Sequence, residues 1–234
     1  MNSILRSRSI LAFVAVLGIG MLAMTNPSQA ADPADEIAKL YALPPSGSAY
    51  VRVVDPMSSG AHIQIGHEQA TQLRPADTSI ATDYVIVPGS QPVQLSVNGE
   101  RVSTHITVPP GDFATAILHK TNAAYTAKIT TDTPSNIDGL KAELVFYNLT
   151  PECEGSITLS SGPTVFESLA SGTRTTRAIN PVAARLIGHC GTQQSAEFTL
   201  PPLKVGDRFS LFLIGDATTP RLVGQINHTR PYRP

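Results

Sequence analysis

The residues of this chain that could do covalent chemistry are scattered and form no known catalytic motif. Acyl-transfer enzymes need a nucleophile, a base and an acid that orients the base, and the sequence has no Gly-x-Ser-x-Gly nucleophile turn. Gly111-Asp112-Phe113 and Gly206-Asp207-Arg208 carry Phe and Arg at the position where a Gly-Asp-Ser esterase has its serine. The sequence therefore favours a protein without catalytic residues of its own, although a triad assembled from distant residues stays open.

The six histidines show no metal-binding spacing. None of them is paired as HxH or HxxxH, and His62 and His67 lie five residues apart in a predicted strand and turn. The sequence also has no phosphate-binding loop and no dinucleotide fingerprint. We therefore expect single surface histidines, no metal site and no cofactor, with a weak zinc site as the alternative.

A short basic segment is the clearest candidate for a binding contact. Residues 173–181 read TRTTRAINP and contain Arg174 and Arg177. Guanidinium groups bind carboxylates through paired hydrogen bonds, so this segment could contact a carboxylated sugar chain or an acidic face of a partner protein. The alternative is an ordinary solvated loop and strand edge.

Residues 1–30 have the pattern of a secretory signal peptide. Arg6 and Arg8 precede an apolar run over residues 10–24, and Ser28-Gln29-Ala30 supplies the small residues that signal peptidase requires. The alternative is a membrane anchor, but the run is shorter than the roughly 20 residues that span a bilayer. We expect an exported protein that is cleaved after Ala30.

Charge and cysteine content agree with export. The chain has a net charge of −1, and removal of a signal peptide with two arginines and no acidic residue makes it −3, which argues against nucleic acid as a partner. Cys153 and Cys190 are the two cysteines. In an oxidising compartment they are expected to form one structural disulfide, and the alternative is a reactive thiol or a metal-binding pair.

The elements that must position these residues are short strands. Apolar and polar residues alternate over residues 51–53, 62–65, 93–97 and 140–147, and Asn98-Gly99 is a strong hairpin signal. Pro (19) and Gly (17) are abundant enough to supply many turns. The pattern predicts an all-β protein built of antiparallel β-sandwiches.

One short helix is predicted ahead of the strands, over residues 32–41. It starts with Asp-Pro, a favourable capping pair, and Ile37, Leu40 and Tyr41 would share one face. A helix of this length is unstable alone in water. Leu40 and Tyr41 are therefore candidate contacts, either with their own domain or with a partner.

The mature chain contains a weak internal repeat. Tyr50–Asp55 lies 93 residues before Glu143–Asn148, and Pro109-Pro110 lies 92 residues before Pro201-Pro202. A repeat of this length has the size of a small domain. We expect two tandem β-sandwich domains.

The boundary between the two domains is predicted in a polar, turn-rich segment. Residues 130–139 include Pro134 and Gly139 and read as a linker. The predicted domains are therefore residues 31–132 and residues 138–234.

Several collinear segments are similar to the AlgF family. Leu40-Tyr41 and residues 45–53 resemble the opening of mature AlgF, and residues 142–149 resemble the opening of its second half. Arg177–Val182 with Arg185-Leu186 resembles a later segment. Together these short motifs span most of the mature chain, and none of them is catalytic.

The resemblance implies a periplasmic protein that is required for O-acetylation of alginate or a similar secreted polysaccharide. It implies a non-catalytic adaptor with two β-sandwich domains, whose partners are periplasmic SGNH-type acetyltransferase proteins and a membrane-bound O-acyltransferase system. Contact with the polysaccharide itself stays open. Two other classes are weighed against this interpretation: a carbohydrate-binding or adhesive surface module without a role in acetylation, and an acetyltransferase or esterase in its own right.

Overall fold

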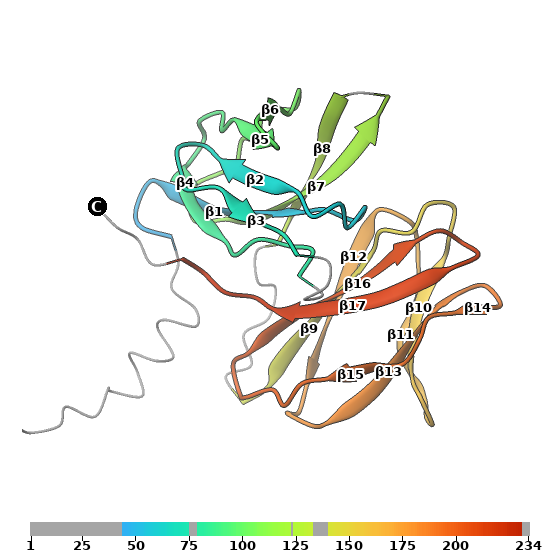
Figure 1. Cartoon of the computed structure of the whole chain (residues 1–234). Helices are drawn as coiled ribbons and strands as arrows, with labels where there is room; N and C mark the ends of the chain where they lie inside the picture. The colour runs from blue at the N-terminus through green and yellow to red at the C-terminus, as the bar shows by residue number, and fades with distance from the viewer. Residues whose placement is uncertain (1–43, 75–78, 123, 133–139, 231–234) are drawn as a thin grey trace, which may run out of the picture.

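The computed structural model describes residues 44–74, 79–122, 124–132 and 140–230, and their strands form two β-sandwiches (Figure 1). The expected all-β class is confirmed, because the described residues contain strands and no helix. Consequently, the described part of the chain has no helix that is long and apolar enough to cross a membrane. The predicted signal peptide and the predicted helix over residues 32–41 lie outside the described residues.

The first half of the chain forms one sandwich, whose two sheets we call the first inner sheet and the first outer sheet. The first inner sheet contains, in spatial order, β4 (Val85–Pro88), β1 (Ser48–Val54), β7 (Phe113–Thr121) and β8 (Ala124–Thr131). The first outer sheet contains, in spatial order, β3 (Thr71–Gln72), β2 (His62–Ile65), β5 (Leu95–Val97) and β6 (Glu100–Arg101).

The second half repeats this plan as a second inner sheet and a second outer sheet. The second inner sheet contains, in spatial order, β12 (Thr173–Ile179), β9 (Ala142–Asn148), β16 (Arg208–Gly215) and β17 (Pro220–Ile226). The second outer sheet contains, in spatial order, β11 (Thr164–Leu169), β10 (Gly155–Leu159), β13 (Ala184–Cys190) and β14 (Gln193–Gln194), with β15 (Phe198–Leu200) also paired to β13.

The two halves have the same topology, which supports the internal repeat. In each half, the first strand along the chain belongs to the inner sheet, the next two to the outer sheet, the fourth to the inner sheet, the next two to the outer sheet and the last two to the inner sheet. Among the described residues, the second half adds one strand to this plan, β15, in its outer sheet. The position of β15 is taken in the first half by a single bridge between Val93 and Ile106. The repeat therefore reflects the folding plan of two equivalent sandwiches.

Register shows the equivalence residue by residue. Each inner sheet contains one parallel pair, β1 with β7 and β9 with β16, which the alternation pattern did not predict. Tyr50 pairs with Phe113 in the first, and Glu143 pairs with Arg208 at the corresponding place in the second. The first pair stacks its rings with centroids 4.9 Å apart, whereas the second forms an ion pair of 2.5 Å. The same backbone site thus carries different chemistry in each half.

The inner sheets are buried on both faces. One face of each packs on its own outer sheet, and the other face packs against the opposite inner sheet, so the molecule has four layers (Figure 1). This explains the nearly unbroken buried runs of β1 and β9, because a strand covered on both sides has no solvent face to keep polar. The contact between the inner sheets is lined by Val54, Ile80, Ala81, Val145, Tyr147, Phe212, Ile214 and Val223.

Local sequence signals explain the outer hairpin of the first half. Val97 pairs with Glu100 across Asn98-Gly99, and both turn residues have positive φ, 53° and 83°. A two-residue hairpin turn of this kind needs positive φ at both positions, which Asn and Gly tolerate best. The predicted hairpin is confirmed.

The end of the described chain returns to the first sandwich. Beyond β17, the Tyr84 backbone N–H donates to the His228 carbonyl and the Arg230 N–H donates to the Tyr84 carbonyl, each at 2.8 Å. Residues 227–230 of the second half are therefore tied to the first. The domain limits 31–132 and 138–234 stay predictions, because their ends include residues outside the described ranges.

Candidate functional site

The most unusual residue of the structure is an arginine with no solvent exposure. Arg52 lies in the middle of β1, on the face that meets the second half, and its exposed fraction is 0%. Its neighbours on the opposite face, Val51 and Val53, point into the first core. A charged group is rarely buried unless it is paired, so the surroundings of Arg52 must satisfy its charge and its N–H donors.

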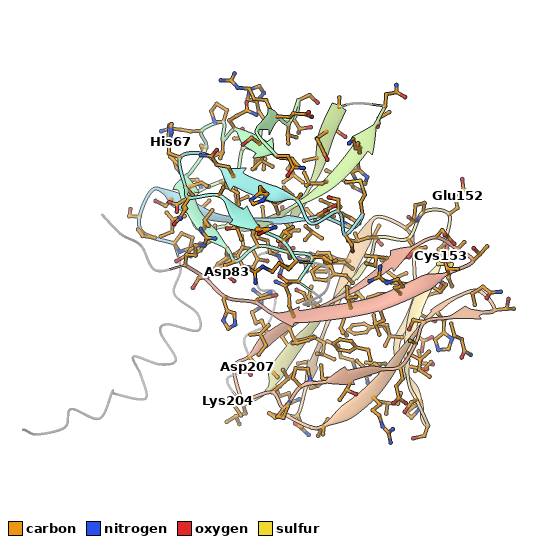
Figure 2. The ribbon with its side chains drawn as sticks, viewed as in Figure 1. His67, Asp83, Glu152, Cys153, Lys204 and Asp207 are labelled. Atoms are coloured by element: carbon orange, nitrogen blue, oxygen red, sulfur yellow. A yellow bond between two sulfur atoms is a disulfide. The ribbon has the colours of Figure 1, made fainter. Side chains whose placement is uncertain are left out.

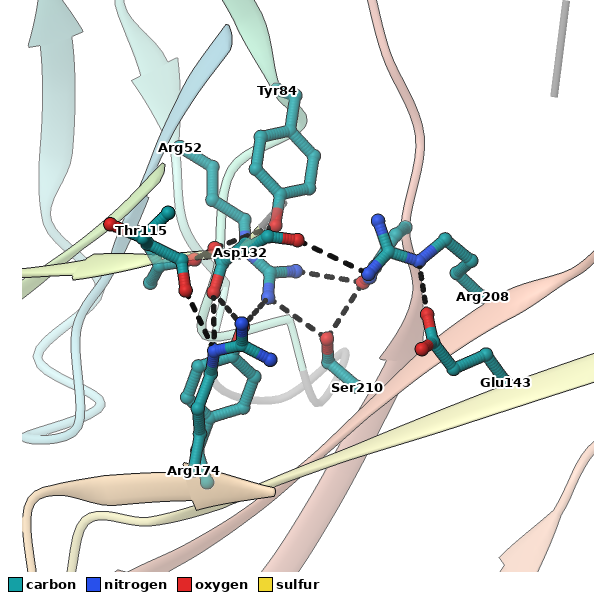
Figure 3. A network of polar contacts seen from close by, with 11 residues as sticks. Arg52, Tyr84, Thr115, Asp132, Glu143, Arg174, Arg208 and Ser210 are labelled. Carbon is teal, nitrogen blue, oxygen red and sulfur yellow. Dashed lines mark hydrogen bonds and ion pairs between the residues drawn. The ribbon is translucent and has the colours of Figure 1, made fainter. Parts of the chain in front are cut away.

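The guanidinium of Arg52 is bonded to both halves of the chain (Figure 3). Within the first half, Nε donates to Thr115 Oγ1 at 2.8 Å. Toward the second half, Nη2 donates to Tyr147 Oη and to Ser210 Oγ, both at 2.9 Å. Nη1 donates to Asn227 Oδ1 at 2.7 Å. Four donor contacts therefore hold one side chain, and three of them cross the junction.

Aromatic rings surround the same guanidinium. Its central carbon lies 4.7 Å from the ring centre of Tyr84, 5.4 Å from that of Tyr147 and 5.6 Å from that of Phe212. Ring faces are electron-rich and attract a cation, more strongly where water is excluded. The rings offset part of the solvation that Arg52 loses on burial.

Asp132 supplies the opposite charge, and hydroxyl groups connect it to Arg52. Thr115 accepts from Arg52 and donates to Asp132 Oδ2, while the Tyr147 hydroxyl accepts from Arg52 and donates to Asp132 Oδ1 at 2.6 Å. Tyr84 also donates to Asp132 Oδ2, at 2.8 Å. We call Arg52, Asp132 and these bridging residues, with Ser210 and Asn227, the junction network.

Burial determines the protonation of the phenols in the junction network. Burial raises the pKa of Tyr147 to about 12, although the positive charge of Arg52 lowers it. Burial likewise raises the pKa of Tyr84 well above its usual value, against the same effect of Arg52. Burial alone would lower the pKa of Arg52, but its interactions with Tyr84, Tyr147 and Asp132 outweigh burial and raise it. At neutral pH the arginine is charged and both phenols are protonated.

The hydroxyl groups of the junction network bond to other residues of the network and join the two halves of the chain. Ser210 Oγ accepts from Arg52 and donates to Asn227 Oδ1 at 2.8 Å, and an amide oxygen is no general base. Thr115 does donate to a carboxylate, but it has 0% exposure, as does Ser210. Neither hydroxyl can meet a polymer without separating the two sandwiches.

Two further arginines border the junction network at its edge. Arg174 Nε donates to the Thr131 carbonyl at 2.8 Å and lies 3.4 Å from Asp132 Oδ1. Arg208 pairs with Glu143 at 2.5 Å and reaches the Asp132 carbonyl at 3.3 Å. Both link the second half to the end of the first, immediately before the predicted linker.

The two arginines of the predicted basic segment lie on opposite faces of one strand. In β12, Arg174 and Arg177 are three residues apart and so project from opposite faces. Arg174 meets the junction network, whereas Arg177 Nη1 donates to the Val165 carbonyl of β11 at 2.6 Å. The two side chains do not form one basic spot, and a partner contact for either stays a prediction. Leu40 and Tyr41 lie outside the described residues.

The predicted disulfide is present. Cys153 and Cys190 are bonded, with 37 residues of sequence separation and 5.5 Å between their Cα atoms. Cys153 lies two residues before β10, and Cys190 ends β13, where it pairs with Gly155, the first residue of β10. The bond therefore ties the β9–β10 loop to the end of β13 at one end of the second outer sheet.

The described residues show one hydroxyl–imidazole pair that could suggest catalysis. Thr158 Oγ1 and His189 Nε2 lie 2.9 Å apart on neighbouring strands β10 and β13. A catalytic triad would need an acid that orients this histidine, and no contact of that kind is seen for His189 within the described ranges. The same part of the chain contains no group of three His, Cys, Asp or Glu that could hold a metal ion.

Sequence reasoning missed the role of Arg52. The alternation of Val51, Arg52 and Val53 places Arg52 on the other face of its strand without showing what covers that face. Tyr50 and Val54 share the face of Arg52 and are buried with it. A strand that is apolar on both sides is a sign of a buried strand. An arginine inside such a run signals a buried ionic contact.

Comparisons with known proteins give one informative match. A family model described as "Alginate O-acetyl transferase AlgF" matches residues 21–204. No curated protein matches the chain. Among solved structures, a family 26 carbohydrate-binding module of Amy13K from Eubacterium rectale, in complex with maltoheptaose, is 8% identical, with 79% of this chain and 98% of that one covered and a TM-score of 0.27. At that TM-score the likeness supports no conclusion about this chain.

Proposed function

Since this chain belongs to the AlgF family and has a role in alginate O-acetylation, we propose that it is a non-catalytic adaptor that holds components of the acetyl-transfer machinery together. Its partners in this proposal are periplasmic SGNH-type acetyltransferase proteins and a membrane-bound O-acyltransferase system. The proposal places the protein in the periplasm.

The observation that carries the proposal is the burial of Arg52 between the two sandwiches. Its donors reach Tyr147, Ser210 and Asn227 of the second half, so a buried side chain bonds the two halves to each other. Two sandwiches joined in this way offer separate surfaces at a fixed spacing. Holding two proteins at a fixed spacing raises the effective concentration of one near the other.

The polar chemistry of the junction supports a role without catalysis. The groups that most resemble catalytic ones, Asp132, Thr115 and Ser210, are buried and bonded to one another or to Arg52. They stabilise the contact between the halves. Purified protein should therefore leave a chromogenic acetyl ester unhydrolysed, and turnover that is lost on Ser210→Ala or Thr158→Ala would contradict the proposal.

The disulfide supports the periplasmic location. Disulfides form and persist in oxidising compartments and are rare in the cytosol. Cys153–Cys190 is such a bond, and residues 1–30 have the pattern of a signal peptide. Cell fractionation with an antibody against the mature chain tests the location directly.

The deciding experiment is the acetyl content of secreted polysaccharide from a strain that lacks only this gene. We expect acetylation to be lost while export of the polymer continues, and a plasmid copy to restore it. Pull-down with the tagged wild-type chain should recover an SGNH-type acetyltransferase. Normal acetylation in the deletion strain would refute the role, and acetylation lost without any recovered protein partner would refute the adaptor mechanism.

A further inference from the structure

A groove runs between the two halves on the exposed side of their contact. Its volume is about 570 Å³. The first half contributes the β1–β2 loop and parts of β7 and β8, and the second half contributes residues after β9, the β11–β12 loop and part of β17. A groove between two units is a common place for a binding site, so its chemistry decides what it could hold.

The charged residues of the groove are all basic. Lys120 and Lys128 come from the first half and Arg221 from the second, with His119 beside Lys120. All four are exposed, and none of the residues that line the groove, which all belong to the described ranges, is Asp or Glu. In a chain with a net charge of −1, this is a local concentration of positive charge. Such a surface attracts an anionic partner.

Apart from Thr121 and Ser171, the side chains of the remaining lining are apolar, and none is aromatic. Met57, with an exposed fraction of 42%, is one of four exposed large apolar side chains among the described residues, and Leu149 and Pro151 lie on the opposite wall. No Phe or Tyr is among the lining residues of the described chain. A sugar polymer would gain most from flat aromatic faces, whereas Met and Leu suit the aliphatic side chains of a protein segment.

The walls of the groove are held in place before anything binds. Lys128 Nζ donates to the Gly172 carbonyl at 2.8 Å, which connects β8 of the first half to the β11–β12 loop of the second. Gly172 has a φ of 71°, and a Cβ there would lie 3.1 Å from Lys128 Nζ. A preformed groove binds with less loss of conformational freedom than one that must assemble.

We propose that this groove binds an extended acidic segment of a partner protein. Carboxylates of the segment pair with Lys120, Lys128 and Arg221, while its aliphatic side chains contact Met57 and Leu149. The inference rests on the proposed adaptor function and identifies the surface and the chemistry of one partner.

A neighbouring acidic hollow gives the bound segment a direction. Glu152, next to Pro151 of the groove, lines this hollow together with Glu154 and Glu167, beside the disulfide. Figure 2 shows Glu152 and Cys153 together at this end of the second sandwich. An acidic segment is attracted by the groove and repelled by the hollow. The segment therefore leaves the groove away from this hollow.

The test compares two double charge reversals with the same change in net charge. Lys120→Glu/Arg221→Glu alters the groove and keeps the contact of Lys128 with Gly172. Arg101→Glu/Lys204→Glu is the matched control, because Arg101 lies in β6 and Lys204 lies at the far end of the second sandwich (Figure 2). Each exported chain is titrated against the purified SGNH-type acetyltransferase of the same alginate system and, separately, against de-acetylated alginate oligosaccharide, at low and high salt.

We expect the groove variant to bind the acetyltransferase with a Kd raised by roughly tenfold or more, because attractive exposed charge pairs become repulsive ones. The control should bind as wild type does, and wild-type affinity should fall at high salt. Equal binding by both variants would overturn the groove while leaving the adaptor function intact. Failure of the wild-type chain to bind the acetyltransferase would refute the adaptor function and this inference with it. Binding of the oligosaccharide that only the groove variant loses would assign the groove to the polymer instead.

Discussion

Arg52 of the first sandwich donates to the Tyr147 hydroxyl of the second, with 2.9 Å between Nη2 and Oη, and both residues are almost completely buried. The two positions are 95 residues apart in sequence. The Tyr147 hydroxyl in turn donates a hydrogen bond to Asp132, the last described residue of the first half. Three of the four donor contacts of Arg52 are thus made only when both halves are in place. We therefore expect the folding of the two sandwiches to be interdependent.

Removal of Arg52 should strongly destabilise the protein. Arg52→Ala removes the fully buried charge that Thr115 and Tyr147 connect to Asp132 and leaves Arg174, at the edge, as the ion-pair partner of Asp132. Breaking one partner of a buried ionic contact costs about 3–5 kcal/mol. Arg52→Lys should recover little, because an ammonium cannot reproduce the planar set of donors. Urea unfolding at neutral pH measures the free energy of unfolding, with exposed Arg101→Ala as the control expected to change it by less than about 0.5 kcal/mol. A small effect of Arg52→Ala would mean that the junction network contributes little.

The junction network should also determine how cooperatively the chain unfolds. In the wild-type protein, Arg52, Tyr147 and Asn227 join the halves, so we expect one unfolding transition seen by all probes. In Arg52→Ala the first and second sandwiches should unfold in two separate transitions. Hydrogen exchange read separately from β7 and β16 distinguishes the two cases. A single transition in both proteins would show that apolar contacts alone unite the halves.

Stability should fall in alkali because of the buried tyrosines. The pKa of Tyr147 is raised from 10.0 to about 12 in the folded protein, so the unfolded chain releases its proton first. The stabilisation is complete below pH 10 and is lost as the pH rises from 10 through 12, by up to about 1.4 kcal/mol per pH unit for each such tyrosine. Tyr84 acts in the same direction. Urea unfolding across this range should show a smaller slope for Tyr147→Phe, and equal slopes would contradict the assignment.

The disulfide should stabilise the second sandwich. Cys153 and Cys190 are 37 residues apart, and a closed loop of this size is worth about 4 kcal/mol in the loop-entropy model. Cys153→Ser should lower the free energy of unfolding of the oxidised protein, and reductant should have the same effect on wild type. If the variant and the wild type unfold at the same urea concentration without reductant, the bond contributes nothing.

The C-terminal segment should act as a clamp. Asn227 accepts from Arg52 Nη1, and residues 228–230 bond to the Tyr84 backbone. Asn227→Ala should cost about 1–3 kcal/mol, because a buried donor of Arg52 loses its acceptor. A chain that ends at Ile226 should lose more, and a chain that ends at Arg230 keeps these contacts and is the control. Equal stability of the Ile226 and Arg230 chains would exclude the clamp.

Sequence reasoning identified the features that depend on nearby residues. Strand alternation predicted the all-β class, Asn98-Gly99 predicted its hairpin turn, and the weak repeat corresponds to two sandwiches of one topology. The Cys153–Cys190 bond followed from the presence of two cysteines in an exported chain. Short collinear motifs were enough to predict membership of the AlgF family, which the family model confirms. Each of these signals is a short sequence pattern, a recurrence of such patterns along the chain, or a property of composition.

Tertiary structure alone decided the features that depend on what covers each strand. Alternation tells which residues share a face of β1, but the partner of that face, the second inner sheet, comes from residues 95 to 175 positions further along. For that reason the sequence pattern did not show that Arg52 is buried, and the structure does. Likewise, Arg174 and Arg177 are close in sequence but lie on opposite faces of β12, while Lys120 and Arg221 come together in one groove. The sequence by itself determined the strands, the bond and the family; long-range packing decided which charges are buried, which are paired and which are presented to a partner.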